Sequence, residues 1–262
     1  MEITVLVENT SKNHLPTEHG LSLYIETRNH KILFDTGQGN LFYENAQKLG
    51  IDLSEVDICI LSHGHYDHGG GLKKFYEINS FAQIYLHEDA YGRFYHGLDR
   101  YIGLDQDWLS NPSFRERLTF VRGATVLDGE LTLYDSLGRD KKISLGEGGL
   151  LKKVGDAYMP DSYSHEQYLM IQEASDKRVL FTGCSHNGIV NIMDWFSPDV
   201  CIGGFHFMKH PLDNKLMECA VLLDTYPCTY YTCHCTGAEE YDYIRHFMKN
   251  LNYLSCGDRI KV

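Results

Sequence analysis

The chain has 262 residues, 43% of them hydrophobic, and a formal net charge of −12 at pH 7. Its length and apolar content provide for a large core, and no Pro/Ser-rich linker divides it, so we expect residues 1–262 to form one domain. The acidic balance, with no basic run or stripe, argues against a nucleic-acid partner.

The sequence also carries no signal for export or for a membrane span. Its N-terminus lacks the basic start and long apolar core of a signal peptide, and no apolar run approaches about 18 residues. Eight cysteines occur without a disulfide-framework spacing, which indicates reduced thiols. We therefore expect a cytoplasmic protein.

Short strands and single helices alternate in the first third of the chain. An amphipathic pattern predicts a helix over 40–49, which Gly50 would end. The other predicted elements are a helix over 70–78 and strands over 3–7, 21–26, 31–34, 57–61 and 83–87.

Three histidines and a carboxylate follow the buried strand 57–61 within six residues, at His63, His65, Asp67 and His68. Imidazole and carboxylate groups at this density indicate a metal site, and the neighbouring glycines allow the tight turn that convergence requires. In extended chain His63 and His65 point to the same side, whereas Asp67 and His68 fall where the chain turns into a helix. Two subsets of ligands on one loop suggest two adjacent metal ions.

Between residues 89 and 149 the periodicity is weak, and aromatic and charged residues mix. One interpretation is an irregular insertion that packs its own aromatic side chains. The other is a lid or wall over the metal site, in which the aromatics of residues 91–108 stack on a flat substrate.

Strands and helices alternate again after residue 168, and three strands end in glycine plus histidine. These strands are expected over 168–173, 178–182, 199–203 and 229–232, and helices over 189–196, 212–225 and 238–250. Loops at strand ends gather sites in α/β proteins, so the loops that carry His186, His206 and His234 should meet in one crevice. Mixed sheets covered by helices give an α/β (α+β) architecture, and two such sheets stacked would form a four-layer sandwich.

These motifs resemble the metallo-β-lactamase superfamily, whose fold is an αββα sandwich. The resemblance rests on the HxHxDH cluster, the upstream Asp35-Thr36-Gly37 and the late His234, and it extends over nearly the whole chain. Together with LVEN, EHGLSLYIE, FTGCSHNGI, IGGFH and HCTG, they are similar to a narrower group named for dihydropterin-ribofuranosyl-aminobenzene 5′-phosphate synthase.

The resemblance implies a set of metal ligands. His63 and His65 would hold the first metal, and Asp67, His68 and His234 the second. Cys184 stands where many members have a bridging Asp, so it is either a ligand or a neighbour. For the remaining histidine we prefer His186 over His165, because His186 heads a helix on the same crevice.

The resemblance also implies one or two divalent transition metals, with zinc first and iron or manganese as alternatives. Asp67 is the candidate for proton handling, and His206, His19 and Ser185 are candidates for substrate binding. Backbone N–H groups of the helix start after residues 183–186 would suit a phosphate, with Lys209 and Arg93 as cationic helpers.

The sequence leaves three functions open. They are a pterin-transferring synthase acting on a phosphorylated pterin or an aryl-ribose phosphate, a hydrolase of a small ester, lactone or phosphodiester, and a non-catalytic metal or redox sensor. The partner in the first two is a small molecule, and neither the oligomeric state nor the physiological metal is indicated.

Overall fold

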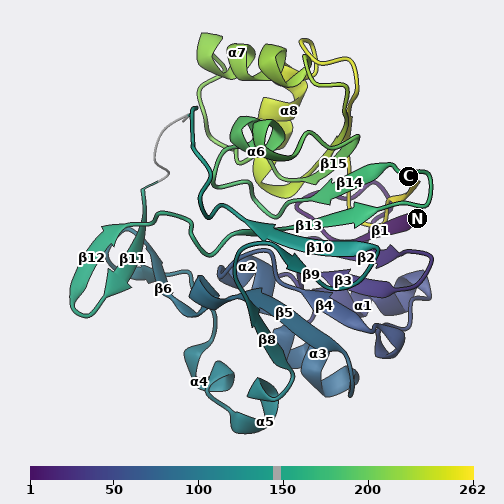
Figure 1. The fold of residues 1–262 in the computed structure, drawn as a ribbon, viewed down its shortest axis with the longest axis vertical. Helices are drawn as coiled ribbons and strands as arrows, with labels where there is room; N and C mark the ends of the chain where they lie inside the picture. Colours follow the sequence, from purple (N-terminus) through teal and green to yellow (C-terminus); the bar gives the residue numbers. More distant parts are fainter. Residues whose placement is uncertain (144–148) are drawn as a thin grey trace.

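The computed structural model describes residues 1–143 and 149–262, and they form two stacked sheets with helices on the outer faces (Figure 1). The first sheet has seven strands, in the order β18 (Arg259–Lys261), β1 (Glu2–Val7), β2 (Ser22–Glu26), β3 (Lys31–Phe34), β4 (Ile58–Ile60), β5 (Gln83–His87) and β8 (Leu118–Val121). The second sheet also has seven, in the order β17 (Leu251–Tyr253), β16 (Thr229–Thr232), β15 (Val200–Gly203), β14 (Arg178–Phe181), β13 (Gln167–Gln172), β10 (Leu131–Asp135) and β9 (Thr125–Val126).

Helices cover each sheet from outside, which completes the four-layer αββα arrangement. On the first sheet lie α1 (Leu41–Leu49), η1 (Leu53–Glu55) and α3 (Leu72–Ile78), with α4 (Gln106–Leu109) and α5 (Pro112–Arg115) beyond them. On the second lie α6 (Ile189–Phe196), α7 (Asn214–Leu223) and α8 (Ala238–Ile244). The expected fold class is confirmed. No helix among the described residues is long and apolar enough to cross a membrane.

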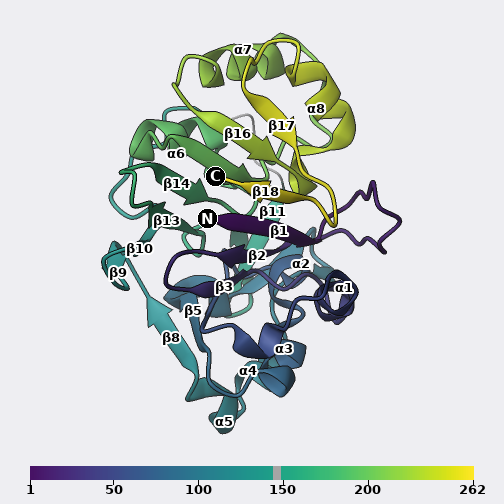
Figure 2. The same ribbon diagram turned by 90° about the vertical axis from the view of Figure 1, so that its right-hand side faces the viewer.

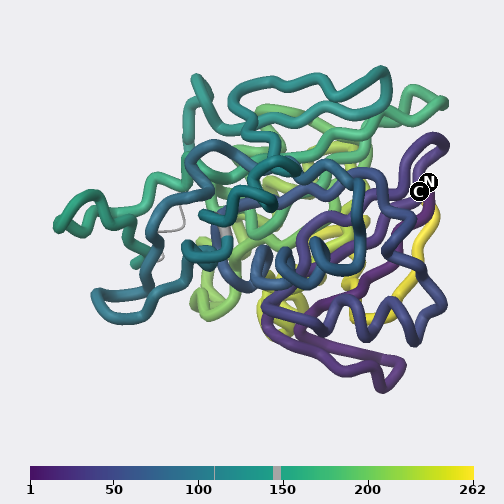
Figure 3. Tube along the Cα trace, turned by 90° about the horizontal axis from the view of Figure 1, so that it is seen from below, coloured from purple at the N-terminus to yellow at the C-terminus, as the bar shows by residue number. Residues whose placement is uncertain are grey.

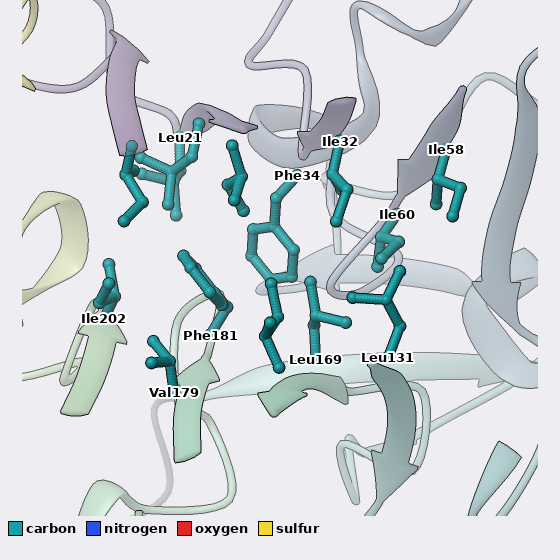
Figure 4. Packing of buried hydrophobic residues seen from close by; sticks show 14 of the residues in the cluster. Leu21, Ile32, Phe34, Ile58, Ile60, Leu131, Leu169, Val179, Phe181 and Ile202 are labelled. Atoms are coloured by element: carbon teal, nitrogen blue, oxygen red, sulfur yellow. The ribbon is translucent and has the colours of Figure 1, made fainter. Parts of the chain in front are cut away.

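Strand residues alternate between two cores because successive side chains point to opposite faces of a sheet. In β3, Ile32 and Phe34 face the second sheet, whereas Leu33 packs under the outer helices. In β14, Val179 and Phe181 face inward and Leu180 packs under α6. Figure 4 shows the inner layer, where side chains from the two sheets meet face to face. Both faces of each sheet are buried, which explains why these strands are apolar throughout.

The chain ends join the first sheet beside each other. β18 pairs antiparallel with β1, and the N-terminal amino group donates a hydrogen bond to the carbonyl of Val262 at 3.0 Å. Figure 2 shows both termini on this edge. β17 and β18 are absent from the expected elements, and α8 ends at Ile244 rather than continuing to residue 250.

The stretch 89–149 is more regular than its sequence indicates. It contains η2 (Glu88–Tyr91), α4 and α5, and it supplies β8 to the first sheet and β9 and β10 to the second. A separate four-stranded sheet, in the order β12 (Ala157–Pro160), β11 (Leu150–Val154), β6 (Arg93–His96) and β7 (Arg100–Tyr101), projects from the sandwich, as Figures 1 and 3 show. Part of the expected insertion, residues 144–148, lies outside the described residues.

Candidate metal centre

Loops from both sheets meet at one edge of the sandwich. β3 and β4 run parallel in the first sheet, and β14, β15 and β16 run parallel in the second, so their carboxyl ends lie on the same side. Several of these loops contain a non-glycine residue with positive φ: 60° at Asp35, 59° at Ser185, 56° at His206 and 49° at His234. Such backbone is costly, and it is concentrated where the side chains converge.

A first group consists of three histidines from two loops. The ligand atoms of His63, His65 and His186 all lie within 4.8 Å of one another. Among the described residues, Nε2 of His63, Nε2 of His65 and both ring nitrogens of His186 have no hydrogen-bond partner, although these atoms are buried. Unpaired buried nitrogens are expensive unless they have a ligand, and three converging imidazoles suit a divalent transition metal.

A second group adjoins the first. His68 Nε2 lies 3.2 Å from His234 Nε2 and 3.1 Å from Cys184 Sγ. Asp67 Oδ2 lies 3.6 Å from His234 Nε2 and 3.9 Å from His68 Nε2. Four donor atoms of the types that bind zinc or iron therefore surround a second point.

Hydrogen-bond partners behind the imidazoles determine which ring nitrogens face the centre of the site. Asp35 Oδ2 accepts from His68 Nδ1 at 2.7 Å and from the Ser62 hydroxyl at 2.7 Å, and that hydroxyl in turn accepts from His63 Nδ1 at 2.9 Å. Asn9 Oδ1 accepts from His234 Nδ1 at 2.9 Å. These hydrogen bonds assign the proton to each Nδ1, so each Nε2 lone pair points into the site.

The electrostatic environment keeps most of these imidazoles neutral. Burial lowers the pKa of His63, His65, His186 and His234 well below the ordinary value. His68 differs: burial lowers its pKa too, but the Asp35 and Asp67 carboxylates outweigh burial and the net shift is upward. Neutral imidazole is the form that ligates a metal.

His165 lies beside the first group without being free to join it. Its Nδ1 accepts from the Gly64 N–H at 3.0 Å, and its Nε2 donates to Asp161 Oδ2 at 3.0 Å. Phe94 packs on the His165 ring, with the two ring centroids 4.0 Å apart. Both nitrogens of His165 are therefore occupied, and His186 is the third histidine that the structure places with His63 and His65.

The candidate substrate residues have different surroundings. Nε2 of His19, an exposed residue, lies 3.4 Å from Asp67 Oδ2. The ring centroids of His206 and His186 are 4.4 Å apart, and His206 lines the pocket above the candidate ligands. Burial lowers the pKa of His206 to about 4. The Ser185 hydroxyl, in contrast, donates to the Gly204 carbonyl at 2.6 Å and is buried.

The helix start after residues 183–186 is not open to a phosphate. The backbone N–H groups of His186 and Asn187 donate to the Glu166 carboxylate at 2.7 and 3.0 Å. Glu166 also accepts from the Tyr168 hydroxyl at 2.7 Å. The expectation of an anion site there is wrong, because a buried carboxylate already fills it.

A pocket of about 280 Å³ opens above the two ligand groups. Arg100 and Lys209 supply its positive charge, and Asp67 is the carboxylate in its wall. Arg100 Nη2 donates to the Tyr66 hydroxyl at 3.1 Å, which holds the guanidinium toward the pocket. Of the two cations that the sequence suggested, Lys209 lines the pocket, whereas Arg93 is exposed on β6 and does not; Arg100 on β7 lines it instead.

Residues 89–149 do contribute to the wall of this pocket, but the Tyr, Phe and Trp side chains of residues 91–108 do not line it. The neighbouring small sheet contributes His96, Arg100 and Leu150 to the pocket. Trp108 instead packs on Phe114, with their ring centroids 3.4 Å apart, in the core under the helices of the first sheet.

Cys233 and Cys235 flank His234, and their side chains point in different directions. The chain at this point forms a short 3-10 helix, η3 (His234–Thr236). Cys233 consequently points into the core between the sheets, and Cys235 points toward Cys184.

Comparison with known proteins agrees with this geometry. A family model described as the metallo-beta-lactamase superfamily matches residues 15–231. The chain belongs to this superfamily.

Two proteins of Methanocaldococcus jannaschii are similar along almost its whole length. One, an uncharacterized protein, is 29% identical over 242 residues and covers 90% of each chain. The other is named 7,8-dihydropterin-6-methyl-4-(beta-D-ribofuranosyl)-aminobenzene-5′-phosphate synthase, and it is 26% identical over 292 residues that include 100% of this chain and 96% of that protein.

A solved superfamily structure has the same fold over the full length. It is the crystal structure of Tm1679, described as a metal-dependent hydrolase of the β-lactamase superfamily, with a TM-score of 0.84 and 28% identity. The match covers 100% of this chain and 99% of that one. The metallo-β-lactamase fold implies divalent metal binding, and the two groups of His, Asp and Cys side chains provide candidate ligands for it.

Proposed function

We propose that this superfamily member is a two-metal enzyme that acts on a small molecule carrying a phosphate or diphosphate group. The observation that supports it most directly is that two adjoining groups of candidate ligands lie beneath one pocket. This pocket has a net positive charge, although the whole chain has a net charge of −12. Low-dielectric walls strengthen the attraction of such a pocket for anions.

His63, His65 and His186 would hold the first metal, and Asp67, His68, His234 and Cys184 the second. Zinc suits this mixture of imidazole, carboxylate and thiolate, and iron or manganese remains an alternative. Such a metal pair, when bound, makes water more acidic and stabilises negative charge on phosphate oxygens.

The chain's own residues would then bind the substrate and manage its protons. Arg100 and Lys209 bind the anionic end, and His206, neutral at pH 7 because burial lowers its pKa to about 4, donates or accepts a hydrogen bond beside it. Asp67 accepts the proton that the nucleophile loses, while His19 at 3.4 Å orients that carboxylate.

Two reactions fit this site, and each is supported by one comparison. The relative that is named as a synthase implies displacement of a diphosphate by an arylamine. This reaction needs positive charge that stabilises the departing diphosphate anion. Ester or phosphodiester hydrolysis is implied by the neighbour described as a metal-dependent hydrolase. Both matches cover this chain completely, and we place the synthase first because that relative is named for a phosphate-bearing product.

Product analysis separates these reactions. The zinc-loaded protein is incubated with the dihydropterin diphosphate and the ribofuranosyl-aminobenzene phosphate, together and singly. Diphosphate release that requires both compounds supports the synthase, whereas cleavage of either compound alone, or of aryl phosphodiesters, supports a hydrolase. His63→Ala should abolish turnover, and His246→Ala, which changes an exposed histidine after α8, should not. No turnover of any phosphate compound with zinc, iron or manganese would contradict the proposal.

A further inference from the structure

Two thiols from separate loops meet beside the second ligand group. Cys184 follows β14, and Cys235 lies in η3 after β16. Their sulfur atoms lie within 4.8 Å of each other, and the Cys235 thiol donates to the backbone carbonyl of Cys184 at 3.4 Å. The side chains are only 4% and 5% exposed, yet both residues line the pocket through which a small molecule reaches the centre.

Gly204 makes this approach sterically feasible. A Cβ atom built on Gly204 would lie 2.3 Å from Cys235 Sγ, which is far inside van der Waals contact. The Gly204 N–H also donates to the Gly183 carbonyl at 2.9 Å, so the loop after β15 is fixed against the loop that carries Cys184. The absent side chain of Gly204 therefore provides the space in which the Cys235 sulfur lies.

We infer that Cys184 and Cys235 form an oxidation site that closes to a disulfide when the metal is absent and a two-electron oxidant such as hydrogen peroxide is present. The S–S bond forms as each thiol gives up one proton and one electron, and the O–O bond of the peroxide breaks to yield two water molecules. A disulfide has an S–S length of about 2.05 Å, so the sulfurs must approach each other by less than about 3 Å.

This disulfide would couple oxidation to metal binding. Cys184 Sγ lies 3.1 Å from His68 Nε2, within the second ligand group, and a disulfide makes this sulfur unavailable as a thiolate ligand. Intracellular disulfides of this kind are usually transient and redox-sensing. The disulfide itself does not depend on the proposed reaction, whereas its effect on metal uptake rests on the proposed metal centre.

Peptide mapping of the intact chain tests the site. Protein freed of metal by a chelator is treated with hydrogen peroxide, its remaining thiols are blocked, and it is digested and examined by mass spectrometry. We expect a linked peptide pair that joins Cys184 to Cys235, lighter by two hydrogen atoms and separated by dithiothreitol. Three results with wild-type protein would overturn the inference. Peroxide could leave these two thiols unlinked, it could join other thiols such as Cys201 and Cys228 instead, or it could oxidise Cys184 to a sulfinic acid.

Variants sharpen the result. Cys235→Ser should remove the link, and Cys219→Ser, which alters a buried thiol on α7 in the core beneath the helices of the second sheet, should keep it. Gly204→Ala should slow the linkage, because its Cβ displaces the Cys235 sulfur. Zinc uptake is measured on the same samples and should fall on oxidation and recover with dithiothreitol. If the disulfide forms and zinc uptake is unchanged, the inference holds and the assignment of Cys184 to the metal centre fails.

Discussion

His68 and His234 point their Nε2 atoms at each other across 3.2 Å, although the two residues lie 166 positions apart. The Nδ1 atom of each already donates, to Asp35 and to Asn9, so two lone pairs face each other at this distance. Two acceptors at this separation require a proton or a cation between them. Burial lowers the pKa of His68, but the Asp35 and Asp67 carboxylates outweigh burial, so the net shift favours positive charge on this ring.

Asp35 should control metal affinity without touching the metal. It is fully buried, and its carboxylate accepts from His68 Nδ1, from the Ser62 hydroxyl and from the Ser62 N–H at 2.7 Å each. We expect Asp35→Asn to weaken zinc binding about 10- to 100-fold, because the partners behind metal ligands set ligand orientation and basicity. Competition with a chromophoric chelator measures this, with the exposed Asp242→Asn as the control. Unchanged affinity in a folded Asp35→Asn protein would show that the contact is not used.

Arg100 should bind the anionic part of the substrate. It lines the pocket, whereas Arg93 on the adjacent strand of the same small sheet does not. We expect Arg100→Ala to raise KM for a phosphate substrate by about tenfold, a loss of roughly 1.4 kcal/mol, with a smaller change in kcat. Arg93→Ala is the matched control and should leave both constants unchanged. Equal effects of the two substitutions would indicate long-range charge rather than a contact.

His30 should make stability fall in mildly alkaline solution. Its ring joins Asp57 and Asp128, at 2.6 Å each, and so ties the two sheets together. Burial lowers the His30 pKa, but the hydrogen bonds to these carboxylates outweigh it and the net shift is upward. The stabilisation is therefore fully present below the unfolded-state pKa of about 6.5 and is lost as pH rises through the folded-state value.

Urea unfolding from pH 5 to pH 9 tests this linkage. The difference in unfolding free energy between wild type and His30→Gln should shrink as the pH increases. A difference that is constant over this range would contradict a charged His30 in the folded protein.

Asp135 should protect the fold against acid. Its carboxylate accepts from His87 Nε2 at 3.1 Å and from the backbone N–H groups of Gly123 and Leu137. Burial raises its pKa, but these hydrogen bonds outweigh burial and lower the pKa to about 2. Its stabilisation is thus present above the unfolded-state pKa of about 3.9 and is lost as pH falls toward 2.

Acid titration of Asp135→Asn measures this contribution. We expect the variant to be less stable than wild type by about 2 kcal/mol at pH 7 and the gap to close below about pH 3. A gap that persists at pH 2 would assign the loss to packing instead of charge.

The sequence predicted the elements whose signals are local. Helix 189–196 and strands 83–87 and 229–232 have the expected bounds, because period and turn residues specify them within a few positions. β9 and β10 were missed, since their short patterns acquire meaning only through pairing: Leu133 of β10 is opposite Leu169, 36 positions away. α8 ends early for a similar reason, as Met248 is buried in the core beneath the helices and the Lys249 N–H donates to Asp224 at 2.7 Å.

The candidate site shows the same division. His63, His65, Asp67 and His68 could be named because one loop carries them, and His234 because a family pattern does. The choice between His165 and His186 could not be made from spacing. It depends on the Gly64 N–H, which holds His165 Nδ1 at 3.0 Å, and on Asp161, which holds the opposite nitrogen. The substrate cations were predicted to be Lys209 and Arg93. Lys209 lines the pocket, but Arg93 does not, because the register of the small sheet, which brings Arg100 to the pocket instead, cannot be read from the sequence.

Metal content is the most direct test of the central claim that two metals occupy this centre. Protein purified without chelators, or reloaded with zinc, is analysed by inductively coupled plasma mass spectrometry beside His63→Ala, His234→Ala and the surface control His246→Ala. We expect about two equivalents of transition metal per chain in wild type and in the control, and about one fewer in each site variant. Less than about one equivalent in wild type, with no further loss in either site variant, would contradict it.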